Sequence, residues 1–207
     1  MLFDKPAELG SSRDAAAFPP TRLLAREEAL GICVSDVEDV KADLANSVVS
    51  ASETHVAVLP TADLADWWQE RARFTSLRVH GKEPQHYGAV CESVGVWVYW
   101  YHDFRRQQVA IQRVKPPPRQ TEEAHVRALA SLLLDALEEA RRWDIPKVLL
   151  WDLSPFTLRA IKLLSDALEI DVKTEERIRK GVPMIRWKGA DDKKNVMVRS
   201  HEFYARG

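Results

Sequence analysis

The fold is decided by residues 94–119, which read VGVWVYWYHDFRRQQVAIQRVKPPPR. Residues 94–101 predict a strand that is apolar on both faces, which is typical of the covered centre of a sheet. Its two faces carry Val96, Val98 and Trp100 on one side and Trp97, Tyr99 and Tyr101 on the other. Residues 102–106 predict a turn and Gln108–Val114 another strand, so the two strands are expected to form an antiparallel hairpin. Residues 87–92 predict the strand before it.

The residues after this hairpin predict a helix, a strand and a second helix. Thr121 opens a long helix that ends near Trp143, with acidic residues in its first turn and basic residues in its last. Residues 147–153 predict a buried strand, and Pro155 begins the next helix. Strands joined through a helix run parallel. The order of elements therefore predicts an α/β (α+β) fold, a mixed sheet flanked by helices.

The part of the chain before this unit predicts mainly helices. Residues 1–20 are rich in Ala, Ser, Gly and Pro and predict a flexible lead-in, so that a single lobe spans residues 21–207. Residues 23–32 predict a short helix. Ser35 and Glu38 have the spacing of a capping box, which predicts the start of a separate helix.

A further helix and a pair of strands complete the expected fold. Residues 56–59 predict a short strand before a helix that runs from the cap at Thr61 to about residue 74. Trp67 and Trp68 follow one another in that helix and so point about 100° apart, which leaves one of them to face away from the core and contact a partner. Residues 182–188 and 195–203 predict a closing hairpin.

Composition excludes several functional classes. The 207 residues carry a formal net charge of −1, which offers no electrostatic case for nucleic acid or an anionic membrane. The first ten residues lack the apolar core of a signal peptide, and no apolar run reaches the roughly 20 residues of a membrane span. Cys33 and Cys91 form no metal-binding spacing, and a reduced, cytoplasmic setting is expected.

The predicted order of strands and helices resembles the GCN5-related acetyltransferase (GNAT) fold. In that fold, the strand before the long helix splays and a Gly-rich loop holds the pyrophosphate of acetyl-CoA with its backbone N–H groups. The corresponding loop here contains Pro116, Pro117 and Pro118 and no glycine. Because proline has no N–H, three donors are missing, and this chain alone is expected to hold no cofactor.

Three segments resemble a narrower family, the C-terminal half of the fungal lysine N6-acetyltransferases of lysine catabolism. They are LPTADL at residues 59–64, GAVCE at 88–92 and WVYWYHDF at 97–104. The resemblance covers roughly residues 21–207. It implies acetyl-CoA-dependent transfer to a lysine amine for the whole protein, whose N-terminal acetyltransferase half precedes the lobe represented by this chain.

Five residues are candidates for contacting a substrate amine: Glu92, Tyr99, Trp100, His102 and Asp103. His102 beside a carboxylate has the chemistry to orient an amine or take its proton, but Asp103 is equally expected to cap backbone N–H groups of the turn. Glu92 has the charge to receive a cationic lysine head against an aromatic wall, or it is an exposed strand end. No residue is assigned a catalytic role, and no metal site is predicted.

Three cations flank the proline loop and are candidates for meeting the anionic part of a cofactor through their side chains: Arg113, Lys115 and Arg119. The leading interpretation is a lobe that supplies substrate-side surface or scaffolding to an acetyltransferase lobe. Two alternatives stay open, a stand-alone interaction module and a complete small acetyltransferase with a divergent loop. The expected partner is an N-terminal acetyltransferase lobe or a second copy of the chain.

Overall fold

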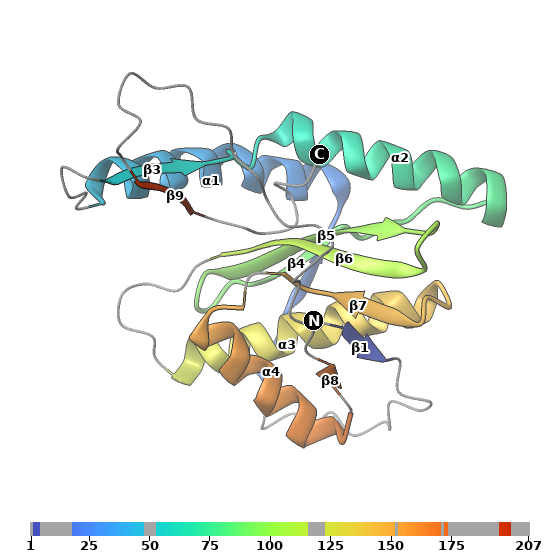
Figure 1. The fold of residues 1–207 in the computed structure, drawn as a ribbon. Helices are drawn as coiled ribbons and strands as arrows, with labels where there is room; N and C mark the ends of the chain where they lie inside the picture. Colours follow the sequence, from blue (N-terminus) through green and yellow to red (C-terminus); the bar gives the residue numbers. More distant parts are fainter. Residues whose placement is uncertain are drawn as a thin grey trace.

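A computed structural model describes residues 2–4, 18–47, 53–115, 123–151, 153–170, 172–173 and 195–199. Its centre is a mixed sheet in which seven described strands lie side by side (Figure 1). Their order is β2 (Arg22–Leu24), β4 (Gly88–Cys91), β5 (Val96–Asp103), β6 (Gln108–Val114), β7 (Lys147–Leu149), β1 (Leu2–Asp4) and β8 (Val172–Lys173).

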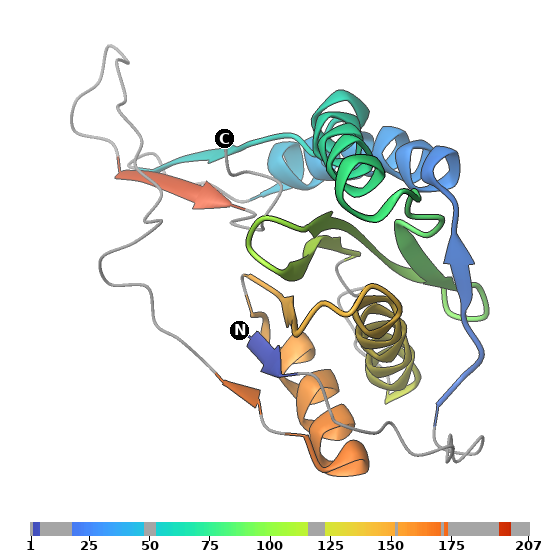
Figure 2. The same ribbon diagram turned by 90° about the vertical axis from the view of Figure 1, so that its right-hand side faces the viewer.

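Helices cover both faces of the sheet (Figure 2). Helices α1 (Arg26–Asn46) and α2 (Ala62–His80) lie on one face, and α3 (Glu123–Arg142) lies against β4 to β7 on the other. Helix α4 (Pro155–Leu168) packs on α3. This arrangement confirms the predicted α/β fold with a mixed sheet between helices.

Strand β5 is buried along its whole length, as its two apolar faces predicted. Val96, Val98 and Trp100 belong to the larger core cluster, which also contains the apolar residues of α3. Trp97 and Tyr99 belong to a second cluster with residues of α1 and α2. Alternation along one strand therefore divides its side chains between the two helical layers.

The connections on either side of β6 are also as predicted. Strands β5 and β6 are antiparallel, and β6 and β7 are parallel across α3. The ladder between β6 and β7 has two paired positions, Val109 with Val148 and Ala110 with Leu149, although β6 continues to Val114. Tyr99 pairs with Arg113 and Trp100 pairs with Ile111, so Gln112 has no partner on β5 and is the extra residue of a β-bulge.

The beginning of the lobe differs from the prediction of two helices. Leu23 lies in β2, and α1 is one continuous helix, so the predicted capping box at Ser35 and Glu38 is wrong. Ser35 lies inside the helix, where its hydroxyl donates to the carbonyl of Ile32 at 2.9 Å. The helix begins instead after Ala25, whose N–H donates to the Glu28 carboxylate at 2.9 Å. An S-x-x-E spacing inside a helix carries no start signal once the backbone is already paired.

Helix α2 begins as predicted and ends later. The hydroxyl of Thr61 accepts a hydrogen bond from the N–H of Leu64, and the helix continues to His80 rather than to residue 74. It stops at Gly81, whose φ of +68° is a left-handed conformation that glycine adopts without strain. Trp68 is 4% exposed and Trp67 56% exposed, as expected for adjacent tryptophans on a helix.

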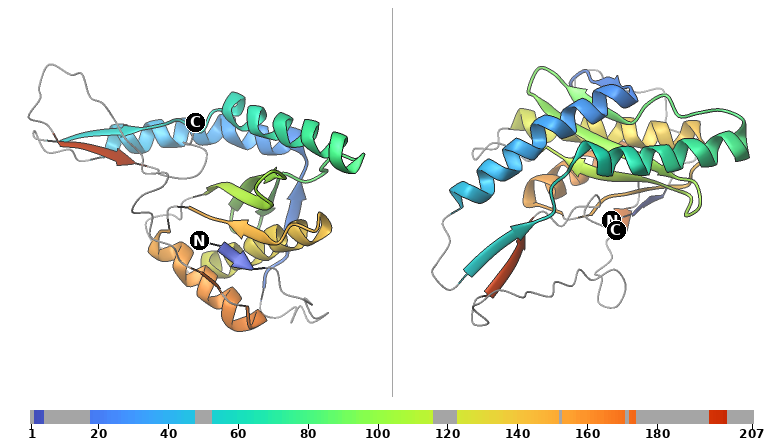
Figure 3. Two further views of the ribbon diagram at one scale, coloured as in Figure 1. Left: turned by 45° about the vertical axis from the view of Figure 1, so that its right-hand side comes forward. Right: turned by 90° about the horizontal axis from the view of Figure 1, so that it is seen from above.

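Two differences concern the ends of the chain. Leu2–Asp4, which lie in the expected lead-in, form β1 between β7 and β8. Strand β9 (Asn195–Arg199) pairs in parallel with β3 (Glu53–Ala57) and forms a ribbon beside the main sheet (Figure 3). The expected partner of β9, residues 182–188, lies outside the described residues. Helix α4 begins as predicted, with Ser154 as its N-cap and Pro155 in its first turn.

Replacing Leu133 by alanine is expected to destabilise the fold by about 2–5 kcal/mol, because its side chain fills the core between α3 and the sheet. Chemical denaturation measures the change. Leu158→Ala on α4 is the matched control, since Leu158 is partly exposed and should cost less. A loss below about 0.5 kcal/mol at Leu133 would contradict this packing.

Candidate functional site

The candidate residues fall at two separate ends of the β5–β6 hairpin. His102 and Asp103 end β5 next to the turn, whereas Arg113 and Lys115 lie where β6 leads into residues 116–122. The register pairs Tyr99 with Arg113, so these two are the only substrate and cofactor candidates that the described ladder brings opposite one another. Arg119 lies outside the described residues.

His102 lies inside the protein against the last turns of α3. Its Nε2 is 3.0 Å from Oε1 of Glu139, and both side chains are buried. The other ring nitrogen, Nδ1, is buried without a hydrogen-bond partner among the described residues. The ring stacks on Phe104 and meets the edge of Trp143. The imidazole is thus held by a carboxylate and two aromatic rings rather than presented to solvent.

Glu139 is the centre of this cluster. Besides His102, its carboxylate accepts hydrogen bonds from the indole of Trp143 at 2.9 Å and the guanidinium of Arg142 at 3.0 Å. His86 Nδ1 lies 3.4 Å from the same carboxylate. Burial raises the pKa of Glu139, but hydrogen bonds from His102 and Arg142 and the charges of the two histidines outweigh burial and hold the pKa below its ordinary value. The cluster keeps Glu139 ionised inside the protein.

The end of α2 completes the wall around this cluster. The ring of His80 lies 5.2 Å from Phe104 and 5.7 Å from Trp143, and the ammonium of Lys82 lies 4.6 Å above the Trp143 ring. A cation over a tryptophan face is attracted by the ring quadrupole. Residues of α2, the β5–β6 turn and α3 therefore meet around Trp143 at this end of the sheet.

The partners of Asp103 lie on β5 and in the turn that follows it. Its carboxylate accepts hydrogen bonds from the Tyr101 hydroxyl and from the backbone N–H of Arg106, both at 3.1 Å. The guanidinium of Arg106 contacts the same carboxylate at 3.1 Å. The turn-capping role that the sequence allowed for Asp103 is therefore present, and its hydrogen-bond partners in the described structure are Tyr101 and Arg106.

Glu92 and Trp100 are far apart along the ladder. Glu92 lies in the exposed turn after β4, next to the start of β5, and pairs with Arg22 at 2.9 Å. Trp100 is fully buried, and its indole N–H donates to the carbonyl of His86 at 3.1 Å. In the described structure, Glu92 and Trp100 therefore do not form the expected site, in which a carboxylate and an aromatic ring would bind a lysine ammonium group together.

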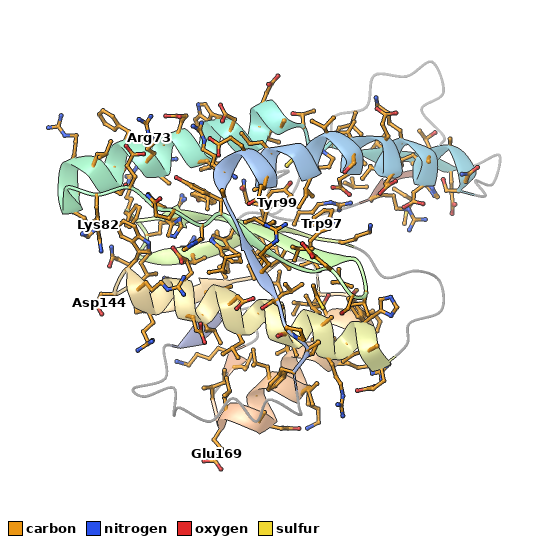
Figure 4. The ribbon with its side chains drawn as sticks, turned by 180° about the vertical axis from the view of Figure 1, so that it is seen from behind. Arg73, Lys82, Trp97, Tyr99, Asp144 and Glu169 are labelled. Carbon is orange, nitrogen blue, oxygen red and sulfur yellow. The ribbon has the colours of Figure 1, made fainter. Side chains whose placement is uncertain are left out.

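Tyr99 lies on the other face of β5, between the sheet and α1, close to Trp97 (Figure 4). Its side chain is fully buried. Burial is the main cause that raises the pKa of Tyr99 well above its ordinary value, and the neighbouring Cys33 adds to it. Burial also raises the pKa of the Cys33 thiol to about 11. Both groups are therefore neutral over the physiological range, which leaves the thiol without nucleophilic character.

The same face holds a buried ion pair. The Nε of Arg113 donates to Asp36 of α1 at 2.5 Å, and a second guanidinium nitrogen donates to the other carboxylate oxygen at 3.0 Å. Both side chains are almost completely buried. This bidentate contact fastens α1 to the end of β6. Lys115 follows at a partly buried position, where its backbone N–H donates to the carbonyl of Trp97 at 2.9 Å.

A family model described as "LYC1 GNAT-like C-terminal domain" matches residues 6–206, which is nearly the whole chain. The chain belongs to this family. The match confirms the resemblance found in the sequence, and it begins nearer the N-terminus than the expected residue 21. No curated protein and no solved structure matches the chain.

In the part of the chain that the structure describes, no group of three or more histidine, cysteine, aspartate or glutamate side chains is placed to hold a metal ion. None of the helices in that part is long and apolar enough to cross a bilayer.

The sequence analysis did not identify Glu139 and Asp36, the carboxylates that pair with His102 and Arg113. Glu139 lies among the apolar residues of α3, and Asp36 lies in a helix whose start was misplaced. A signal for Glu139 exists in retrospect, because Ser131, Asp135 and Glu139 recur every four residues and place a polar stripe inside a largely buried helix. No local pattern marks Asp36, whose partner lies 77 positions away.

Arg113→Ala is expected to destabilise the protein by about 3–5 kcal/mol, because it leaves the Asp36 carboxylate buried without its cation. The matched control is Arg159→Ala, which removes an exposed pair with Glu123 and should cost at most about 1 kcal/mol. Urea denaturation of both variants measures the difference. Equal losses would show that the Asp36 contact adds nothing beyond a surface pair.

Glu139→Gln should reduce stability at neutral pH, and the difference from the parent protein should shrink as the pH falls below about 4.5, the ordinary pKa of glutamate. The sign follows from the lowered pKa in the folded state, since such a carboxylate stabilises the fold above its unfolded pKa and loses that contribution as pH falls through the folded pKa. Denaturation at neutral and acid pH measures it. A difference that stays constant with pH would contradict the assignment.

Proposed function

We propose that this chain is a GNAT-like lobe that provides substrate-side surface or scaffolding to an acetyl-CoA-dependent N-acetyltransferase, and that it does not catalyse transfer alone. The observation that supports the proposal most directly is the buried ion pair between Arg113 and Asp36. A cation held in this way is not available to an anionic cofactor at the end of β6.

The loop sequence supports the same conclusion. A pyrophosphate at a helix N-terminus requires several convergent backbone N–H donors. Pro116, Pro117 and Pro118 supply none. Lys115 and Arg119 provide charge near this position without the fixed geometry of a backbone cradle. Tyr99, Trp100 and His102 on β5 are all buried, which favours the scaffolding part of the proposal over contact between these side chains and a substrate.

One observation favours a second candidate, a complete small acetyltransferase. Strands β6 and β7 pair over two positions, and β6 then continues to Val114 in its ladder with β5, with a bulge at Gln112. Parallel strands that separate in this way are the element that the GNAT resemblance associates with an acyl-CoA arm. Binding of acetyl-CoA by the chain therefore separates the two candidates.

Isothermal titration calorimetry with acetyl-CoA tests the proposal. We expect weak or no binding by the purified chain and no acetylated product from free lysine, because the loop lacks three backbone donors. Replacing the three prolines by glycine restores those donors and is the matched variant. Micromolar binding by the unaltered chain that is lost in Arg119→Ala, but kept in Arg105→Ala on the exposed hairpin turn, would overturn the proposal and favour the small enzyme.

The scaffolding role is tested by measuring binding between this chain and an acetyltransferase lobe, and the activity of the complex. An N-terminal acetyltransferase lobe from a protein of this family should bind the chain in the same calorimeter, and the complex should acetylate lysine faster than that lobe alone. If the lobe neither binds nor gains activity, the chain is better described as a stand-alone interaction module.

A further inference from the structure

The outer side of α2 carries large apolar side chains that point away from the sheet. Trp67 is 56% exposed and Phe74 is 64% exposed, whereas Ala65, Ala72 and Ser76 on the opposite side of the helix are buried. Two exposed aromatic residues two helical turns apart form a line along the helix. Such exposed apolar lines are typical of interaction surfaces.

Two arginines complete this line, which we call the α2 crest (Trp67, Arg71, Phe74 and Arg78). The guanidinium of Arg71 lies 5.5 Å from the ring centroid of Trp68. The guanidinium of Arg78 lies 5.9 Å from the ring centroid of Phe74. Neither arginine has a carboxylate partner among the described residues. The α2 crest is therefore aromatic and cationic, the composition that concentrates binding energy at protein interfaces.

A neighbouring arginine of α2 differs from Arg71 and Arg78, because carboxylates pair with it. Arg73, labelled in Figure 4, lies off the crest and is paired with Glu70 and Glu83. Glu70 and Glu83 are thus directed to Arg73 rather than to Arg71 or Arg78.

The outer side of α1 has the opposite character. Glu27, Gly31, Val34 and Glu38, here called the α1 stripe, repeat at the same intervals as the α2 crest, and all four are exposed. Its centre is small or aliphatic, with Val34 at 63% exposure and no atom within 4 Å of a side chain added at Gly31. Glu27 has no ion-pair partner among the described residues, and Glu38 pairs with exposed Lys41.

Crest and stripe lie on the same face of the protein. Both helices lie on the same face of the sheet (Figures 1 and 3), and Ala29 and Cys33 of α1 share a core cluster with Ala65 of α2. The outer sides of both helices therefore face away from the sheet. Bulky cationic and small acidic surfaces on one face are self-complementary. A two-fold axis through such a face brings each surface onto its counterpart in the other copy.

We propose that the chain forms a two-fold symmetric dimer in which the α2 crest of each copy packs on the α1 stripe of the other. Phe74, which lies between the two arginines along the helix, covers Gly31 and Val34, while Arg71 and Arg78 meet Glu27 and Glu38. The formal net charge of −1 imposes little repulsion between copies. This inference is independent of the acetyltransferase proposal, since it concerns neither the loop nor the cofactor.

Charge reversal on each surface provides a test that misfolding cannot imitate. One variant carries Arg71→Glu and Arg78→Glu, and the other carries Glu27→Arg and Glu38→Arg. Within either variant, both symmetry-related contacts join like charges, so the dissociation constant of the dimer should rise by about tenfold or more. In an equal mixture of the two variants, both contacts join opposite charges, and the dimer should return as a heterodimer.

Sedimentation velocity over a wide range of concentration measures all three samples beside the parent chain. The control carries Arg127→Glu and Arg141→Glu at exposed positions of α3 on the other face, and it should dimerise like the parent. A monomeric parent chain, dimers that persist in both variants, or a mixture that stays monomeric would each overturn the proposal.

Discussion

The complete burial of β5 is the constraint on which the rest of the structure depends. A strand with apolar side chains on both faces requires cover on both, and the chain supplies α3 on one face and α1 with α2 on the other. The hairpin with β6 and the crossover through α3 then fix the parallel position of β7. Once both faces are covered, a charged side chain on β5 or β6 requires a partner of opposite charge inside the protein.

That requirement explains the two buried carboxylates. His102 projects from β5 toward α3, where Glu139 meets it, and Arg113 projects from β6 toward α1, where Asp36 meets it. Each pair joins a strand to the helix that covers it. Residues with the chemistry of a catalytic site are thereby used to position helices, and their burial and pairing give them a structural role independent of any substrate.

Periodicity was sufficient for the central strands and the helices that follow them, and insufficient for the start of the chain and for the contacts between elements. The two faces of β5, the parallel β6–β7 pair and the start of α4 at Pro155 could be predicted, because each depends on local spacing or on a topological rule. Two helices were predicted where α1 is continuous, because a capping-box spacing at Ser35 also occurs inside helices. The partners Asp36 and Glu139 depend on how helices dock, and docking is decided by residues distant in sequence.

The ion pair between Asp36 and Arg113 also bears on cofactor binding. An anion at the end of β6 captures Arg113 only by leaving the Asp36 carboxylate buried and unpaired, at a cost of about 3–5 kcal/mol. At about 1.4 kcal/mol for each factor of ten, that cost lowers affinity by between about a hundredfold and several thousandfold. The proline loop lacks the backbone donors that would offset such a loss. The contact that fastens α1 to the sheet therefore opposes the capture of Arg113 by an anion at this position.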